Sequence, residues 1–167
     1  MENVVKHSLI LASMMVLAVP AEAQEDSLPP ASIRAPNPTV DAVLAPVRAL
    51  FVGIAAHDPE VILPHIVEGA TISIADSRAG ANQPVRTVAF SDWLAQLSSA
   101  TEQYEERMPN PVVDIDGDIA MVWGFYTFHR NSAFSHCGAD HFSLVREESG
   151  WKIANLAFSM RATDCGE

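Results

Sequence analysis

The strongest constraint on the fold lies in the carboxy-terminal third of the chain, where long stretches suited to strands are separated by short turn signals. The Asp-Gly pair at 116–117 is a strong signal for a two-residue hairpin loop. The Ser-Gly pair at 149–150 predicts another tight turn. Residues 119–130, 136–147 and 151–163 are therefore predicted to form successive antiparallel strands.

The preceding part of the chain has the pattern of helices. Residues 39–57 carry apolar side chains three and four positions apart, which is typical of one buried helix face. Asp58-Pro59 predicts the start of a short second helix, and residues 92–100 a third that buries Trp93. A short strand is expected at 71–75. Helices followed by a strand meander are typical of an α+β domain.

Side chains alternate between the two faces of a strand, so the turns also predict which residues share a face. Pairing the strands about these turns predicts one common face for Tyr126, His141, Ser143, Leu156 and Phe158. The same pairing puts His136 and Asp140 on the other face. Both faces of the middle strand are largely apolar, whereas a sheet exposed on one side would alternate with polar residues. We therefore expect helices on one face and a second copy of the chain, in a homodimer, on the other.

The amino terminus predicts export. A basic residue precedes the apolar run 9–19, and Ala21-Glu22-Ala23 offers small residues for cleavage. The run is shorter than the roughly 20 apolar residues that cross a bilayer. We therefore interpret 1–23 as a signal peptide, 24–38 as a disordered proline-rich linker, and 39–167 as the folded domain. The mature protein is expected to be periplasmic or secreted and free of the membrane.

The net charge limits the classes of binding partner, and the cysteine content indicates a disulfide. The chain has 21 acidic and 10 basic residues and a formal net charge of −11, which argues against nucleic acid and anionic membranes. Cys137 and Cys165 are the only cysteines, and in an exported chain they favour a disulfide over two free thiols. Pairing about the 149–150 turn puts Cys137 opposite Ala162, so Cys165 can fold back onto it.

Several short motifs resemble those of the nuclear-transport-factor-2-like superfamily. They are Val-Arg-Ala-Leu-Phe at 47–51, His-Asp at 57–58, Asp-Gly-Asp-Ile-Ala at 116–120, His-Cys-Gly-Ala-Asp at 136–140 and Gly-Trp-Lys-Ile at 150–153. Members include ketosteroid isomerase, scytalone dehydratase and SnoaL-like polyketide cyclases, and the sequence is most similar to an exported branch labelled lumazine-binding. The resemblance implies a cystatin-like cone, with amino-terminal helices packed on a strongly curved antiparallel sheet around a pocket.

The resemblance to ketosteroid isomerase favours the face with His141 as the concave one, with Ser143 where the isomerase has an acidic pocket group. No match exists for the isomerase's general-base aspartate or its helix tyrosine, so isomerase activity is not expected. The residues expected to bind a ligand are Phe51, Trp93, Tyr126, His141, Ser143, Leu156 and Phe158.

Three functions remain open from the sequence. The first is an exported protein that binds a small apolar or cyclic molecule without a cofactor. The second is a cofactor-independent enzyme for proton transfer, with His141 as base and Tyr126 as donor, or with Asp140 and His136 if the faces are reversed. The third is a structural dimer whose cone is filled by its own side chains. Three histidines fall in one hairpin, but their alternation keeps them from converging, so no metal is expected.

Overall fold

The computed structural model of the protein describes residues 38–78 and 85–165. These residues belong to one unit, Arg34–Glu167. The expected signal peptide at 1–23, and the expected linker up to residue 37, lie outside the described residues.

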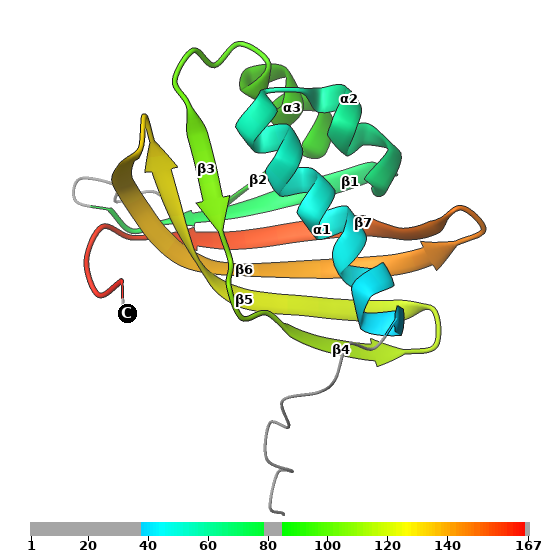
Figure 1. Cartoon of the computed structure of the whole chain (residues 1–167). Coiled ribbons are helices and arrows are strands. Elements are labelled where there is room, and N and C mark those ends of the chain that lie inside the picture. The colour runs from blue at the N-terminus through cyan, green and yellow to red at the C-terminus, as the bar shows by residue number, and fades with distance from the viewer. Residues whose placement is uncertain (1–37, 79–84, 166–167) are drawn as a thin grey trace, which may run out of the picture. The chain divides into compact units, whose positions relative to one another are not determined.

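Helices come first and long strands last, as the sequence predicts. The elements are α1 (Pro38–Ala56), α2 (Pro59–Ile62), the 3-10 turn η1 (Leu63–His65), β1 (Ile66–Asp76), β2 (Arg86–Ala89), α3 (Phe90–Leu97), β3 (Tyr104–Arg107), β4 (Val112–Asp116), β5 (Ile119–Arg130), β6 (Ala133–Glu147) and β7 (Gly150–Met160). Within the described residues the strands form one seven-stranded sheet in the order β2-β1-β7-β6-β5-β3, and β4 also pairs with β5. The protein is thus an α+β domain with a curved sheet (Figure 1).

One strand pair departs from the expected antiparallel arrangement. β1 runs parallel to β7, with Ile72 opposite Leu156, so the sheet is mixed. A parallel pair needs a long connection, and here α3 and the β3–β6 strands lie between the two partners in the chain. Neither β2 nor β3 was expected, because both are four residues long and mainly polar or exposed.

Helix α1 lies across one face of the sheet (Figure 1). Val43, Val47, Leu50 and Ile54 are each at most 4% exposed and form the stripe that the sequence spacing predicts. By length and composition α1 would also suffice to cross a membrane. In this structure its apolar stripe packs on the sheet instead.

The next helix begins where the sequence indicates. Asp58 is the N-cap of α2, and its carboxylate accepts a hydrogen bond of 2.9 Å from the backbone N–H of Glu60. Pro59 occupies the first turn, where its missing N–H costs no helical hydrogen bond. Between the two helices His57 has a positive φ, and the Asp58 N–H donates to the Gly53 carbonyl at 3.0 Å, which ends α1.

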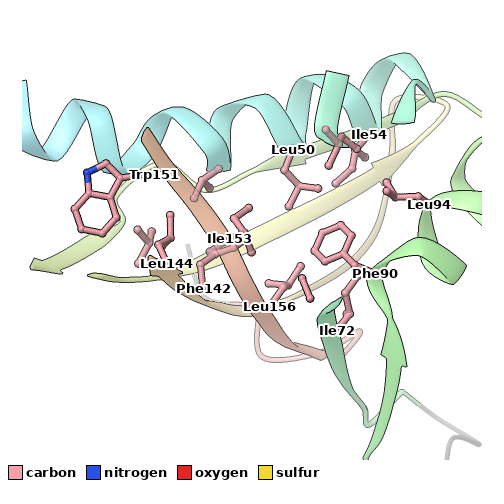
Figure 2. Packing of buried hydrophobic residues seen from close by; sticks show 14 of the residues in the cluster. Leu50, Ile54, Ile72, Phe90, Leu94, Phe142, Leu144, Trp151, Ile153 and Leu156 are labelled. Atoms are coloured by element: carbon pink, nitrogen blue, oxygen red, sulfur yellow. The ribbon is translucent and has the colours of Figure 1, made fainter. Parts of the chain in front are cut away.

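The core lies between α1, α3 and the concave face of the sheet, where labelled side chains from helix and strands point toward one another (Figure 2). Phe142, Leu144 and Ile153 are at most 1% exposed, and Phe90, at the start of α3, is 2% exposed. Fully burying a side chain of this kind stabilises a fold by about 1.5–3 kcal/mol. This packing holds the helices on the sheet.

The face assignment expected for the last strands is wrong, and two register shifts explain it. The β5–β6 turn contains only Asn131 and Ser132, both with positive φ, and the register shifts by one residue between Phe128 and His129. Asp140, not His141, therefore lies opposite Gly124. A shift of one residue moves every following side chain to the other face.

A second shift lies in the β6–β7 hairpin. Leu144 pairs with Ile153 but Ser143 pairs with Asn155, so β7 gains one residue at this point. As a result, Ile153 and Leu156 both belong to the core although their positions differ by an odd number. The concave face combines Tyr126 of β5 with even-numbered positions of β6.

The two cysteines form the disulfide that the sequence favours. Cys137 and Cys165 are bonded, with their Cα atoms 5.6 Å apart. Cys137 also exchanges backbone hydrogen bonds of 2.9 and 2.8 Å with Arg161, one position from the expected partner Ala162. The bond holds the chain after β7 against β6.

We expect the Cys165→Ser variant to lose about 3–4 kcal/mol of unfolding free energy, because opening a loop of 28 residues restores entropy to the unfolded chain. Urea unfolding followed by circular dichroism measures this, with Thr163→Ser as a control in the same segment. A loss below about 1 kcal/mol would show that the bond adds little to stability.

Candidate functional site

A cavity of about 270 Å³ lies between α1, α3 and the concave face of the sheet. Its lining residues are Leu50, Ile54, Trp93, Gln96, Leu97, Tyr104, Glu106, Tyr126, Phe128, Arg130, His136, Asp140, Leu156, Phe158 and Met160. Most of these side chains are apolar or aromatic, as in small-molecule pockets. The polar groups are few, and two of them are acids.

The acids come from two different strands. Glu106 lies on β3 and Asp140 on β6, and Asp140 is only 2% exposed. Gly124 lies opposite Asp140, and a Cβ there would be 2.7 Å from the Met108 side chain. The missing side chain therefore lets the segment after β3 lie close to the sheet, while Glu106 itself is placed by the pairing of β3 with β5 opposite Phe128.

The two carboxyl groups cannot both be ionised without a cost. Within the part of the chain that the structure describes, Oδ2 of Asp140 is buried and accepts no hydrogen bond from an N–H or hydroxyl donor. A buried carboxylate oxygen without a donor is strongly unfavourable. Protonation of Asp140 removes this buried charge, and the nearby acid Glu106 favours the neutral form further.

The same burial shifts the pKa values of both acids. Burial raises the pKa of Asp140 well above its usual range, and the charge of Glu106 and their hydrogen bond raise it further. Burial also raises the pKa of Glu106 to about 7, although the hydrogen bond from Asp140 partly opposes this. Above about pH 7 the pair thus holds one proton, on Asp140, whereas below this pH Glu106 is protonated as well.

His136 lies on the same strand as Asp140 and is also buried. Burial, followed by the charges of Arg78 and Arg130, lowers the pKa of His136 to about 4. Its Nδ1 is 3.1 Å from the Ser135 hydroxyl, and its ring stacks on Phe128 with centroids 4.9 Å apart. His136 is therefore a neutral imidazole in the cavity wall.

Tyr126 is held as a neutral phenol. Its hydroxyl donates a hydrogen bond of 2.8 Å to the Ser159 carbonyl, and burial raises its pKa. Gly138 lies opposite Tyr126, and a Cβ there would overlap the Ser159 backbone. The glycine thus allows both the close strand approach and the position of the tyrosine ring.

The rings in the wall are in contact with one another. Tyr104 lies 5.2 Å from Phe128, and Tyr126 lies 5.8 Å from His136 and 6.5 Å from Phe158, measured between ring centroids. These rings come from β3, β5, β6 and β7, and Trp93 of α3 adds another to the lining. The cavity therefore has a continuous aromatic wall.

The structure brings some of the expected ligand-binding residues together and separates others. Trp93, Tyr126, Leu156 and Phe158 line the cavity. So do Asp140 and His136, the pair expected for reversed faces.

The remaining candidates lie elsewhere. His141 pairs with Trp123 and Ser143 with Met121, which puts both histidine and serine on the face away from the cavity, because of the register shifts described above. Phe51 packs its ring edge-on against Phe142, 6.4 Å away, and does not line the cavity. His141 is thus not placed to act as a base in this cavity.

Sequence reasoning missed Glu106. The signal was weak, because β3 reads Tyr-Glu-Glu-Arg and has no run of apolar residues. In the structure Tyr104 and Glu106 are half-buried while Glu105 and Arg107 are exposed, but two adjacent glutamates give no sign of this in the sequence. Among the residues that the structure describes, no cluster of three or more histidine, cysteine or acidic side chains could hold a metal ion.

The helices and curved sheet around one cavity define an NTF2-like protein with a cystatin-like fold, and comparisons with known proteins agree. The profile of the family described as "Putative lumazine-binding" matches residues 38–159. The chain belongs to this family. No curated protein matches the sequence.

Solved structures share the fold. An NTF2-like protein from Cytophaga hutchinsonii has a TM-score of 0.60 at 14% identity, over 72% of this chain and 97% of its own. A "putative dehydratase from the NTF2-like family" from Streptomyces avermitilis has a TM-score of 0.58 at 16% identity, over 74% and 98%. An NTF2-like protein from Novosphingobium aromaticivorans has a TM-score of 0.58 at 13% identity, over 72% and 80%. At these identities the likeness concerns the fold alone.

The raised pKa of Glu106 predicts a pH-dependent difference between the wild type and the Glu106→Gln variant. The folded protein holds this proton up to about pH 7 whereas the unfolded chain loses it near 4.5, so stability falls as pH rises through this window. Relative to the wild type, the variant should gain roughly 2–3 kcal/mol between pH 4 and pH 8.

Urea unfolding at both pH values measures this gain. His136 titrates with the opposite sign, because its pKa is lowered, but it does so in both proteins and cancels in the difference. Glu105→Gln is the matched control, since Glu105 is exposed and paired with Arg107. An equal gain in the control would refute burial as the cause.

Proposed function

We propose that the protein binds a small, mostly apolar molecule in the cavity and that the Glu106–Asp140 pair positions its polar group. The observation that carries the proposal is the pair itself: two acids line an aromatic cavity of about 270 Å³, and Asp140 is only 2% exposed with its Oδ2 unpaired among the described residues. Burying them costs stability, and such costs are concentrated at functional sites. The family description, which names lumazine, supports a small-molecule ligand.

The size of the cavity limits the ligand. Ligand pockets commonly span roughly 300–1,000 Å³, so a cavity of about 270 Å³ suits a compact molecule of one or two rings. The lining contains Leu50, Ile54 and Leu97 on the helical side, opposite the aromatic wall. Apolar contact therefore accounts for most of the binding surface, and the acids supply orientation.

Native mass spectrometry after mild extraction from the host tests this proposal. We expect a retained small molecule on the wild type and at least a tenfold lower occupancy on Leu156→Phe, which adds volume inside the cavity. Leu63→Phe makes the same change at a side chain that is 46% exposed and should keep the ligand. Circular dichroism verifies that both variants fold. Absence of any bound molecule, or equal occupancy in both variants, would contradict the proposal.

A second candidate is a cofactor-independent enzyme for proton transfer. It is favoured by the pKa of Glu106, about 7, which suits a general base near neutral pH. Glu106 would remove a proton from carbon beside a carbonyl while Asp140 donates a hydrogen bond to the carbonyl oxygen, giving an enolate that this hydrogen bond stabilises. The solved relative titled a "putative dehydratase" is consistent with this kind of chemistry.

The proposed role of Glu106 as general base can be tested with 5-nitrobenzisoxazole. The ring of this compound opens when a base removes its carbon-bound proton. The protein should accelerate the opening with a midpoint near pH 7, and Glu106→Gln should reduce the rate roughly 100-fold or more. Absorbance of the phenolate product gives the rate. Glu105→Gln should retain full activity, and a rate independent of Glu106 would remove it as the base.

We also propose that the protein is exported and dimeric. The amino-terminal pattern and the disulfide support export, which sequencing the amino terminus of the mature protein would test.

Phe125 is 61% exposed and contacts Trp123 on the face away from the helices, and this supports a homodimer through that face. Sedimentation of Phe125→Glu at micromolar concentration should then show a monomer, whereas Val85→Glu should remain dimeric.

A further inference from the structure

We propose that the ligand is a planar ring compound without negative charge, with a hydrogen-bond acceptor and a donor on neighbouring atoms of one edge, and that this edge binds Asp140 and Glu106. A lactam has this pattern: its carbonyl accepts and its N–H donates. This inference rests on the proposed function and specifies its ligand class.

The planar shape of the proposed ligand follows from the aromatic wall of the cavity. Tyr104, Tyr126, Phe128, His136 and Phe158 all line the cavity, and each ring lies within 6.5 Å of a neighbour. Flat ligands gain from contact with aromatic faces and edges, since rings prefer offset or edge-on neighbours. A bulky saturated ring would lose these contacts in a cavity of about 270 Å³.

The donor–acceptor edge follows from the need to satisfy both acids. Both acids line the cavity, and within the described residues Oδ2 of Asp140 has no hydrogen-bond partner. A ligand that only accepts would pair with the proton of Asp140 and give no donor to the half-buried Glu106 carboxylate. A ligand that only donates would pair with Glu106 and leave the proton of Asp140 without an acceptor from the ligand. A ligand with both groups accepts from Asp140 and donates to Glu106, so no buried group is left unpaired.

The absence of negative charge on the proposed ligand follows from the same pair of acids. Above about pH 7 the two acids together carry one negative charge in a mostly apolar cavity. An anionic edge would add a second charge beside it, which low-polarity surroundings penalise strongly. Arg130, the cation in the lining, is already paired with Glu102 at 3.4 Å and lies 5.8 Å from the Tyr104 ring centroid.

Three matched probes test the inference by isothermal titration at pH 8, where Glu106 is ionised. They are 2-quinolone, which is planar with a lactam edge; coumarin, which has the same shape but no N–H; and decahydroquinolin-2-one, which keeps the lactam but is not planar. We expect 2-quinolone to bind at least tenfold more tightly than either of the others. The preference over coumarin should disappear in Glu106→Leu and persist in Glu105→Leu.

The outcomes separate this inference from the proposed function. Equal binding of 2-quinolone and coumarin would overturn the donor–acceptor edge, and equal binding of the saturated lactam would overturn planarity. If none of the probes binds while native mass spectrometry finds a retained molecule, the ligand class is wrong and the binding function stands. If neither experiment detects a ligand, both proposals fall.

Discussion

Two one-residue register shifts, one in each carboxy-terminal hairpin, decide which side chains face the helices. The first puts Asp140 rather than His141 beside Gly124, and the second lets Ile153 and Leu156 share the core face. Alternation allows only two choices for each strand, so the positions of His136 and Asp140 of β6 in the cavity depend on the first shift. Bulges of this kind redirect side chains at functional sites in many sheets.

The cavity combines a favourable core with an unfavourable pair of acids. Around it, side chains such as Phe142 and Leu144 are almost completely buried and stabilise the fold. Glu106 and Asp140 lie among apolar side chains, and the fold would be more stable if apolar side chains took the place of the two acids. Burying such a pair is costly, and costs of this kind are concentrated at functional sites.

The glycines in the site show how backbone approach creates the cavity. Gly124 admits Met108, and with it the segment that follows Glu106, and Gly138 admits the Ser159 carbonyl that holds the Tyr126 hydroxyl. Both positions sit on long strands where a side chain would otherwise be expected to pack. Close approach of other groups to the backbone explains both exceptions.

The sequence alone determined the order of the elements, the α1 stripe, the Asp58 cap and the pairing of Cys137 with Cys165, because local periodicity, turn residues and cysteine count depend on nearby chemistry. It also identified Trp93, Tyr126, Leu156 and Phe158 as lining residues, together with the alternative pair of Asp140 and His136. Only the tertiary structure decided that Asp140 meets Glu106, that His141 faces away, and that β1 runs parallel to β7. Bulges and contacts between distant strands depend on the whole sheet, so no local pattern could have shown them.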